Sequence, residues 1–143
     1  MARTDLATLH TEVAERAGRR CEYCHLPEDA SWAIHEVDHV IARKHGGTTD
    51  LDNLAYACLD CNRHKGTDLA SLDPQTGQIT QLFNPRTQKW DDHFRLTGDG
   101  TIAPLTAEGR TTAALLKFND PLRVQIRADL ITAGKLSSTP GQS

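Results

Sequence analysis

The stretch VDHVIARKHGGTTDLDNLAYACLDCNRHKG, residues 37–66, contains an Asp-His pair, a central Asn and a Cys-x-x-Cys-Asn run within one short segment. A second Cys-x-x-Cys pair precedes it in CEYC, residues 21–24. A lone histidine would indicate little, but this combination has the residue types and the spacing of a metal site. The two stretches therefore predict a site assembled from residues that lie far apart in the chain.

The composition limits the class of protein. With 143 residues, 38% of them hydrophobic, the chain can form one compact domain with an appended subdomain. No apolar run approaches the roughly 18 to 20 residues of a membrane span, and residues 1–20 have no apolar signal core. We therefore expect a cytoplasmic protein with no membrane partner. Thiols stay reduced in that compartment, so the four cysteines favour a metal over disulfides.

Four thiolates in two pairs suit a tetrahedral zinc ion and leave no open coordination position, which is typical of a structural site. The predicted zinc ligands are Cys21, Cys24, Cys58 and Cys61. CEYCH is also the Cys-x-x-Cys-His pattern of covalent haem attachment, with His25 as axial ligand. Haem would leave the second cysteine pair unexplained, so zinc is the favoured interpretation.

Residue periodicity predicts an α+β fold for the first half of the chain. The expected elements are a helix over residues 5–17 built on Leu6, Leu9, Val13 and Ala17 and capped by Thr4 or Asp5, a strand within residues 31–40 that uses Trp32, Ile34 and Val40, a loop over residues 41–53, a strand within residues 53–60, and a helix that begins at the second cysteine pair. The two strands and the last helix would surround the Asp-His pair.

Three side chains of the opening stretch suit phosphodiester hydrolysis, which needs a proton acceptor near neutral pH and positive charge at the phosphate. His39 suits the proton role, since an unperturbed imidazole titrates at about 6.5. Asp38 and Asn62 offer oxygen ligands, which Mg²⁺ or another hard divalent cation prefers. Adjacent strand residues point to opposite faces, so Asp38 and His39 serve one site only if the strand ends or bends there.

Residues 37–66 and CEYC together resemble the HNH endonuclease family, whose ββα-metal core has a strand ending in Asp-His, a loop with a central Asn, a second strand and a helix after a cysteine pair. The resemblance implies a nuclease that cuts nucleic acid, with double-stranded DNA as the expected partner, and leaves a 5′-phosphate and a 3′-hydroxyl. His39 would be the general base, and Asp38 and Asn62 would bind the catalytic cation. Asn53 would hydrogen-bond the loop and orient His39. Because Asn62 occupies the family's third signature position, the chain would be an H-N-N variant.

Basic side chains near the motif are expected on the nucleic-acid surface. They are Arg43, Lys44, Arg63, His64 and Lys65. Lys65 follows Asn62 by three residues and would share its helix face, so it is expected to touch a phosphate oxygen. For Arg63 and His64, a solvated helix surface is an equal alternative.

Three regions are expected along the chain: a zinc-held HNH core with its N-terminal helix over residues 1–73, an α+β extension packed on the core over residues 74–136, and a flexible tail over residues 137–143. The extension is expected to contain a strand within residues 77–90, a hairpin over residues 93–105 that turns at Gly98-Asp99-Gly100, a helix within residues 106–118, and a helix within residues 119–136 with Asp120 as cap and Pro121 in its first turn. Trp90 and Phe94 are expected in a core, and Asp91, Asp92 and His93 in a polar turn rather than a metal site.

The main competing hypothesis is a zinc module that binds nucleic acid or protein without cutting it. The net charge of −3 favours that hypothesis slightly, since proteins that coat nucleic acid are usually basic. The complete set of Asp38, His39 and Asn62 opposes it.

Overall fold

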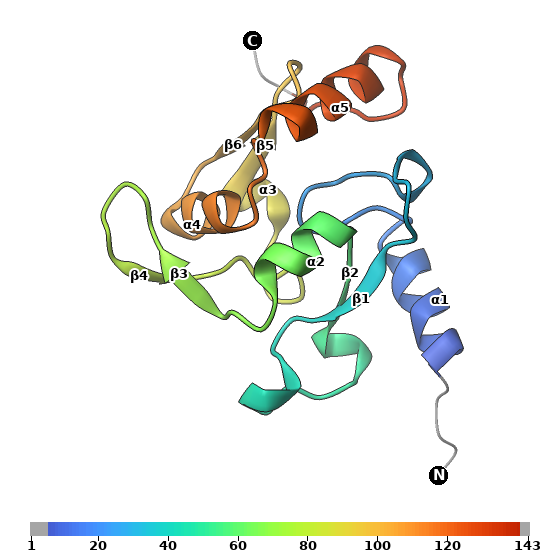
Figure 1. Cartoon of the computed structure of the whole chain (residues 1–143), viewed down its shortest axis with the longest axis vertical. Coiled ribbons are helices and arrows are strands. Elements are labelled where there is room, and N and C mark those ends of the chain that lie inside the picture. The colour runs from blue at the N-terminus through green and yellow to red at the C-terminus, as the bar shows by residue number, and fades with distance from the viewer. Residues whose placement is uncertain (1–5, 141–143) are drawn as a thin grey trace. The chain divides into compact units, whose positions relative to one another are not determined.

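The structure is a computed structural model that describes residues 6–140 (Figure 1). Its helices are α1 (Leu6–Arg16), α2 (Leu59–Lys65), α3 (Trp90–His93), α4 (Ala107–Leu115) and α5 (Pro121–Thr132). Its strands are β1 (Glu36–His39), β2 (Leu54–Ala57), β3 (Ala70–Leu72), β4 (Ile79–Gln81), β5 (Phe94–Leu96) and β6 (Ile102–Pro104). No helix within residues 6–140 is long and apolar enough to cross a membrane. The α+β prediction is confirmed, and the strands form three antiparallel pairs.

The described chain divides into two compact units. The first runs up to Thr67 and also includes Asn84–Thr87, and the second comprises Asp68–Phe83 and the chain from Gln88 onward. The expected boundary after residue 73 would separate β3 from β4, its only partner among the described strands.

The first unit is built from α1 and the β1–β2 hairpin. Val13 and Ala14 of α1 are buried against Leu54 and Tyr56 of β2, and these four residues form the local core. This packing explains the helical periodicity seen in the sequence. Leu6, expected on the same face, is instead 78% exposed because it begins the helix beyond the edge of that core. The expected caps Thr4 and Asp5 lie outside the described residues.

The first strand is shorter than the sequence suggests. Pairing begins at Glu36, which faces Ala57, and ends where His39 faces Leu54. Trp32 and Ile34, expected within the strand, are 88% and 71% exposed. The reason is a competing local contact: the backbone N–H of His35 donates to Glu28 Oε2, at 2.9 Å, so the chain enters the sheet only after this point.

The helix α2 begins directly at the second cysteine pair, as expected. Cys58 is its N-cap, and the Cys58 sulfur accepts a hydrogen bond from the backbone N–H of Cys61. The helix ends after seven residues at Gly66, whose φ of +52° is unfavourable for residues with a side chain. This short element therefore places one helical face against β1 (Figure 1).

The second unit contains two hairpins and two longer helices. The β5–β6 hairpin turns at the expected glycines, and the N–H of Thr97 donates to the carbonyl of Thr101 across the turn. The predicted starts of α4 and α5 are also confirmed, because the side chains of Thr106 and Asp120 each accept a backbone N–H two or three residues further on. The buried core of this unit includes Phe83, Phe94, Leu96, Ile102, Leu116 and Phe118.

The chain end is only partly described, and the described part is held in place. The N–H of Thr139 donates to the carbonyl of Leu96, and the N–H of Leu96 donates to the Thr139 hydroxyl, each at 2.8 Å. These bonds join Thr139, within the expected tail, to the last residue of β5. Residues 141–143, also expected to be flexible, lie outside the described residues.

The segment Trp90–His93 forms the short helix α3 where the sequence predicts a polar turn. Asp91 and Asp92 are exposed, whereas the His93 ring is buried with its Nδ1 2.6 Å from the hydroxyl of Thr106. Phe94 is fully buried, and the Trp90 ring lies 5.1 Å from it but stays half-buried. The core prediction is therefore right for Phe94 and right in part for Trp90.

Candidate active site and metal centre

Four buried cysteine side chains form one cluster. They are Cys21, Cys24, Cys58 and Cys61, and their sulfur atoms all lie within 4.8 Å of one another. The sulfurs of Cys24 and Cys58 are 3.6 Å apart. Sulfurs bonded to one ion at about 2.3 Å would have comparable separations, so the cluster fits a tetrahedral zinc ion.

Local backbone geometry supports thiolate ligands in this cluster. The N–H of Cys24 donates to the Cys21 sulfur, and the N–H of Cys61 donates to the Cys58 sulfur, each at 3.4 Å. Burial raises the pKa values of the Cys21 and Cys61 thiols well above the ordinary value for cysteine. Four thiolates in such a setting require a cation to offset their charge, which a bound metal supplies.

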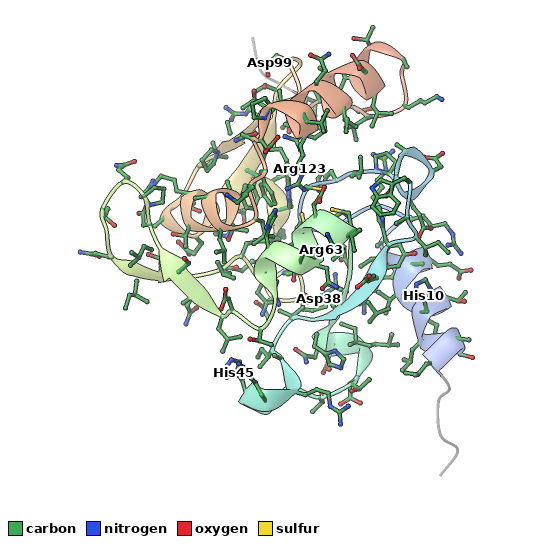
Figure 2. The ribbon with its side chains drawn as sticks, in the orientation of Figure 1. His10, Asp38, His45, Arg63, Asp99 and Arg123 are labelled. Atoms are coloured by element: carbon green, nitrogen blue, oxygen red, sulfur yellow. The ribbon has the colours of Figure 1, made fainter. Side chains whose placement is uncertain are left out.

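Asp38 lies on β1 on the side that faces α2 (Figure 2). Its side chain is 5% exposed and has two partners. The hydroxyl of Tyr23 donates to Oδ2 at 2.8 Å, and the Lys65 ammonium lies 3.2 Å from Oδ2 and 3.4 Å from Oδ1. Burial raises the pKa of Asp38, against the opposing effects of the Lys65 ammonium and the Tyr23 hydroxyl. Burial and the nearby Asp38 also raise the pKa of Tyr23, so its hydroxyl keeps the proton that it donates.

Lys65 is not the surface residue that the sequence predicts. Its side chain is 2% exposed, and its ammonium also donates to the carbonyl of His39 at 3.2 Å. The expected face of α2 is correct, since Lys65 and Asn62 both reach β1, but that face is turned into the protein. The side chain therefore neutralises Asp38 and is withdrawn from the surface where a phosphate would bind.

His39 is the last residue of β1 and is half-buried. Its Nε2 lies 3.0 Å from the hydroxyl of Thr49, in the loop that follows the strand. His39 still pairs with Leu54 as the final residue of the strand, and both His39 and Asp38 line one pocket at this strand end.

Asn53 connects the two ends of that loop. Its amide nitrogen donates to the carbonyls of Ile41 and Thr48, at 2.9 and 2.8 Å, and its Oδ1 accepts the N–H of Ile41 at 3.0 Å. The backbone carbonyl of Asn53 also accepts the N–H of Val40 at 2.9 Å. An apolar side chain could not satisfy these groups, and a carboxylate could not donate to the two carbonyls.

Asn62 projects from the first turns of α2 toward β1. Its amide nitrogen donates to Oε2 of Glu36, which leaves the amide oxygen on the other side of the carboxamide. Asp38, His39 and Asn62 line one pocket of about 240 Å³, together with Val37, Ala42, Arg43, Gly66 and Thr67. Asp38 and Asn62 both line this space, and carboxylate and amide groups contain the oxygen ligands that a hard divalent cation prefers.

The remaining basic residues of the motif are more accessible than Lys65. Arg43 and Lys44 are exposed in a short 3-10 turn, Arg43–His45, and Arg43 also lines the pocket. Arg63 is exposed on α2 (Figure 2), and His64 is half-buried. Their contact with nucleic acid stays a prediction.

Two residues of the site were missed by the sequence analysis. Tyr23 lies between two cysteines whose own chemistry accounts for that stretch of the sequence. Glu36 was missed although it precedes Asp38 by two residues, a spacing that places both side chains on the same face of a strand. That spacing was the available signal for Glu36, whereas the sequence contains no comparable signal for Tyr23.

Comparison with known proteins identifies one family. Residues 21–68 match the family model described as HNH endonuclease. The match covers about a third of the chain and includes both cysteine pairs, the Asp-His pair, Asn53 and Asn62. The chain therefore carries an HNH-family domain of nuclease type, as the motif predicted. Comparisons with curated proteins and with solved structures gave no significant match.

Proposed function

We propose that the HNH domain at residues 21–68 hydrolyses phosphodiester bonds of nucleic acid, with double-stranded DNA as its substrate. The observation that carries this proposal is the pocket shared by Asp38, His39 and Asn62. These residues come from the end of a strand and from a helix more than twenty positions further along the chain. One pocket thus offers an imidazole and two oxygen donors.

His39 acts as the general base. Its imidazole takes a proton from a water molecule as that water attacks phosphorus in line with the leaving oxygen. A P–O bond to the water forms and the bond to the 3′ oxygen breaks. The leaving oxygen takes a proton from solvent water, which gives a 3′-hydroxyl and a 5′-phosphate. The Thr49 hydroxyl and the loop closed by Asn53 hold the imidazole in one orientation.

Asp38 and Asn62 hold a divalent cation, Mg²⁺ or another ion of similar preference. When bound, such an ion neutralises the phosphate and stabilises the leaving oxygen. Asp38 reaches the pocket as a carboxylate because Lys65 offsets its charge and Tyr23 hydrogen-bonds it. Asn62 contributes its amide oxygen while its nitrogen stays bonded to Glu36.

The zinc cluster is structural in this proposal. Four sulfur ligands complete its coordination and leave no position for water or substrate. The cluster links the turn after α1 to the start of α2, and so it holds the helix that carries Asn62. Exposed Arg43, Lys44 and Arg63, with His64, supply contacts to the phosphate backbone.

Supercoiled plasmid tests this function. We expect purified protein to nick plasmid with Mg²⁺ or Mn²⁺, and His39→Ala to lower the rate by at least about 100-fold, the usual contribution of a general base. His10→Gln is the matched control, since His10 bonds the carbonyl of His35 away from the pocket. Chelator is used at a concentration that leaves about one zinc per chain, measured by mass spectrometry.

Two outcomes of this experiment would contradict the proposal. Cleavage that His39→Ala leaves unchanged would remove His39 from the general-base role. Tight DNA binding without cleavage in either metal would instead support the competing zinc module, which binds nucleic acid without cutting it.

A further inference from the structure

We propose that Tyr23 is a positioning residue that connects the zinc site to the cation site through Asp38. The inference rests on the proposed function, since it assigns Asp38 to the catalytic cation. It adds a second role for the CEYC stretch, which was expected to contribute only zinc ligands. The role follows from one buried hydrogen bond and from the place in the chain where its donor lies.

Tyr23 is held on both sides by zinc ligands. Cys21 lies two positions before it and Cys24 directly after it, and the N–H of Cys21 donates to the carbonyl of Leu26 at 2.9 Å, which closes the turn. The Tyr23 side chain is 1% exposed, so the ring has little freedom to move. Its hydroxyl reaches Asp38 Oδ2 at 2.8 Å. The position of this hydroxyl is thus set by the first cysteine pair.

The other donor to Asp38 comes from the segment that follows the second cysteine pair. Lys65 lies four residues after Cys61, on the helix whose N-cap is Cys58. Both side chains that bond the Asp38 carboxylate therefore belong to segments joined at the sulfur cluster. Assembly of that cluster brings the two donors to the end of β1 together.

The two carboxylate oxygens of Asp38 differ in their contacts with Tyr23 and Lys65. Oδ2 receives the Tyr23 hydroxyl and the closer approach of Lys65, whereas Oδ1 receives only the longer contact at 3.4 Å. The Tyr23 bond therefore fixes the rotation of the carboxylate, and Oδ1 is the less engaged oxygen. Hydrogen bonds to a metal-binding carboxylate orient it, and their removal typically lowers metal affinity or activity by about 10- to 100-fold.

The test measures cation binding directly, in a protein that does not turn over. Mn²⁺ is titrated into His39→Ala full-length protein and its free concentration is followed by electron paramagnetic resonance. Tyr23→Phe removes only the hydroxyl, and we expect the dissociation constant for Mn²⁺ to rise by at least about tenfold while zinc stays near one per chain. Tyr56→Phe is the matched control, because Tyr56 is also buried and its hydroxyl also donates to a carboxylate, that of Glu28, outside the pocket.

A double variant distinguishes an effect through Asp38 from a general loosening of the unit. If Tyr23 acts through Asp38, Tyr23→Phe will leave Mn²⁺ affinity unchanged when Asp38→Asn is already present. A further loss of affinity in the double variant would overturn the proposal.

Failure of this inference is separable from failure of the proposed function. Equal Mn²⁺ affinity in Tyr23→Phe and Tyr56→Phe overturns the role of Tyr23, whether or not plasmid is cut. With His39 restored, Tyr23→Phe is expected to need more Mn²⁺ for half-maximal cleavage and to approach the wild-type rate at saturating Mn²⁺. A loss of rate that saturating Mn²⁺ does not recover would also overturn it.

Discussion

The Asn53 side chain and the Ile41 backbone form two hydrogen bonds with each other, one accepted from the Ile41 N–H at 3.0 Å and one donated to its carbonyl at 2.9 Å. A third bond runs to the Thr48 carbonyl. Together these bonds close the loop that begins immediately after His39 and contains Thr49, the partner of the imidazole. The orientation of the proposed base therefore depends on Asn53, fourteen positions further along the chain.

Asn53→Asp is expected to lower nicking by about 100-fold, because a carboxylate cannot donate to the carbonyls of Ile41 and Thr48, and small displacements of a catalytic group have costs of this size. Single-turnover rates on plasmid measure the effect, and zinc content is expected to stay near one per chain. Asp52→Asn, at an exposed neighbouring position, is the control. Equal rates for Asn53→Asp and wild type would refute this role of the loop.

Gly47→Ala is expected to disrupt the same loop by steric means. A Cβ at this position would lie 1.7 Å from the carbonyl oxygen of Ile41 and 2.9 Å from the Asn53 amide nitrogen, so backbone must move. We expect a loss of activity similar to that of Asn53→Asp. Gly98→Ala, where a Cβ meets nothing within 4 Å, is the matched control, and comparable rates for the two alanine variants would contradict the prediction.

Cys58→Ser is expected to abolish zinc binding and to unfold the first unit. Structural zinc contributes about 10 to 16 kcal/mol in small sites, which is comparable with the whole stability of a domain, about 5 to 15 kcal/mol. Metal analysis and resistance to proteolysis provide the measurement. His25→Asn is the control, because His25 follows the first cysteine pair but is not part of the sulfur cluster. Zinc retained by Cys58→Ser at one per chain would show that another ligand set holds it.

Replacing Arg43 and Lys44 by alanine is expected to lower the affinity for DNA. It is also expected to make that affinity less dependent on salt concentration. If each residue contacts one phosphate, the slope of log affinity against log salt falls by roughly 2. Fluorescence anisotropy at several salt concentrations gives this slope, with His39→Ala present to prevent cleavage. Alanine at exposed Lys89 and Lys135 matches the change in charge. The same slope in both pairs of variants would exclude a specific role for Arg43 and Lys44.

Acid is expected to destabilise the second unit through Asp73. The Arg110 guanidinium binds both oxygens of Asp73, at 3.0 and 2.8 Å, and holds the pKa of that carboxyl well below its ordinary value. A carboxyl group whose pKa is lowered in the folded state stabilises that state at pH values above its unfolded pKa, which is about 3.9 for Asp. This stabilisation is lost as the pH falls below that value toward the folded-state pKa.

Thermal unfolding followed from neutral pH to about pH 2.5 tests this effect. We expect Asp73→Asn to have a lower unfolding temperature than wild type at neutral pH, and the difference to shrink in acid. Asp91→Asn, at an exposed position on α3, is expected to behave like wild type. A difference between wild type and Asp73→Asn that does not change with pH would contradict the assignment.

The sequence alone determined the HNH-type domain at residues 21–68, the α+β class and several element ends. These features depend on residues that are close together in the chain or on fixed spacings. The hydroxyl of Thr106 and the carboxylate of Asp120 each cap a helix through a backbone N–H two or three positions away, and such contacts form wherever that helix packs. Each cysteine pair is likewise a local unit, because a Cys-x-x-Cys turn can form without contacts from the rest of the chain.

Only the tertiary structure decided which charged side chains are buried and with which partners. Lys65 shares a helix face with Asn62, as the spacing indicates, but periodicity does not reveal that this face is turned toward Asp38 instead of solvent. Tyr23 reaches the same carboxylate across fifteen positions of chain. The physical reason is that the environment of a side chain depends on how separate segments pack. The residue pattern of one segment does not indicate which other segment packs against it.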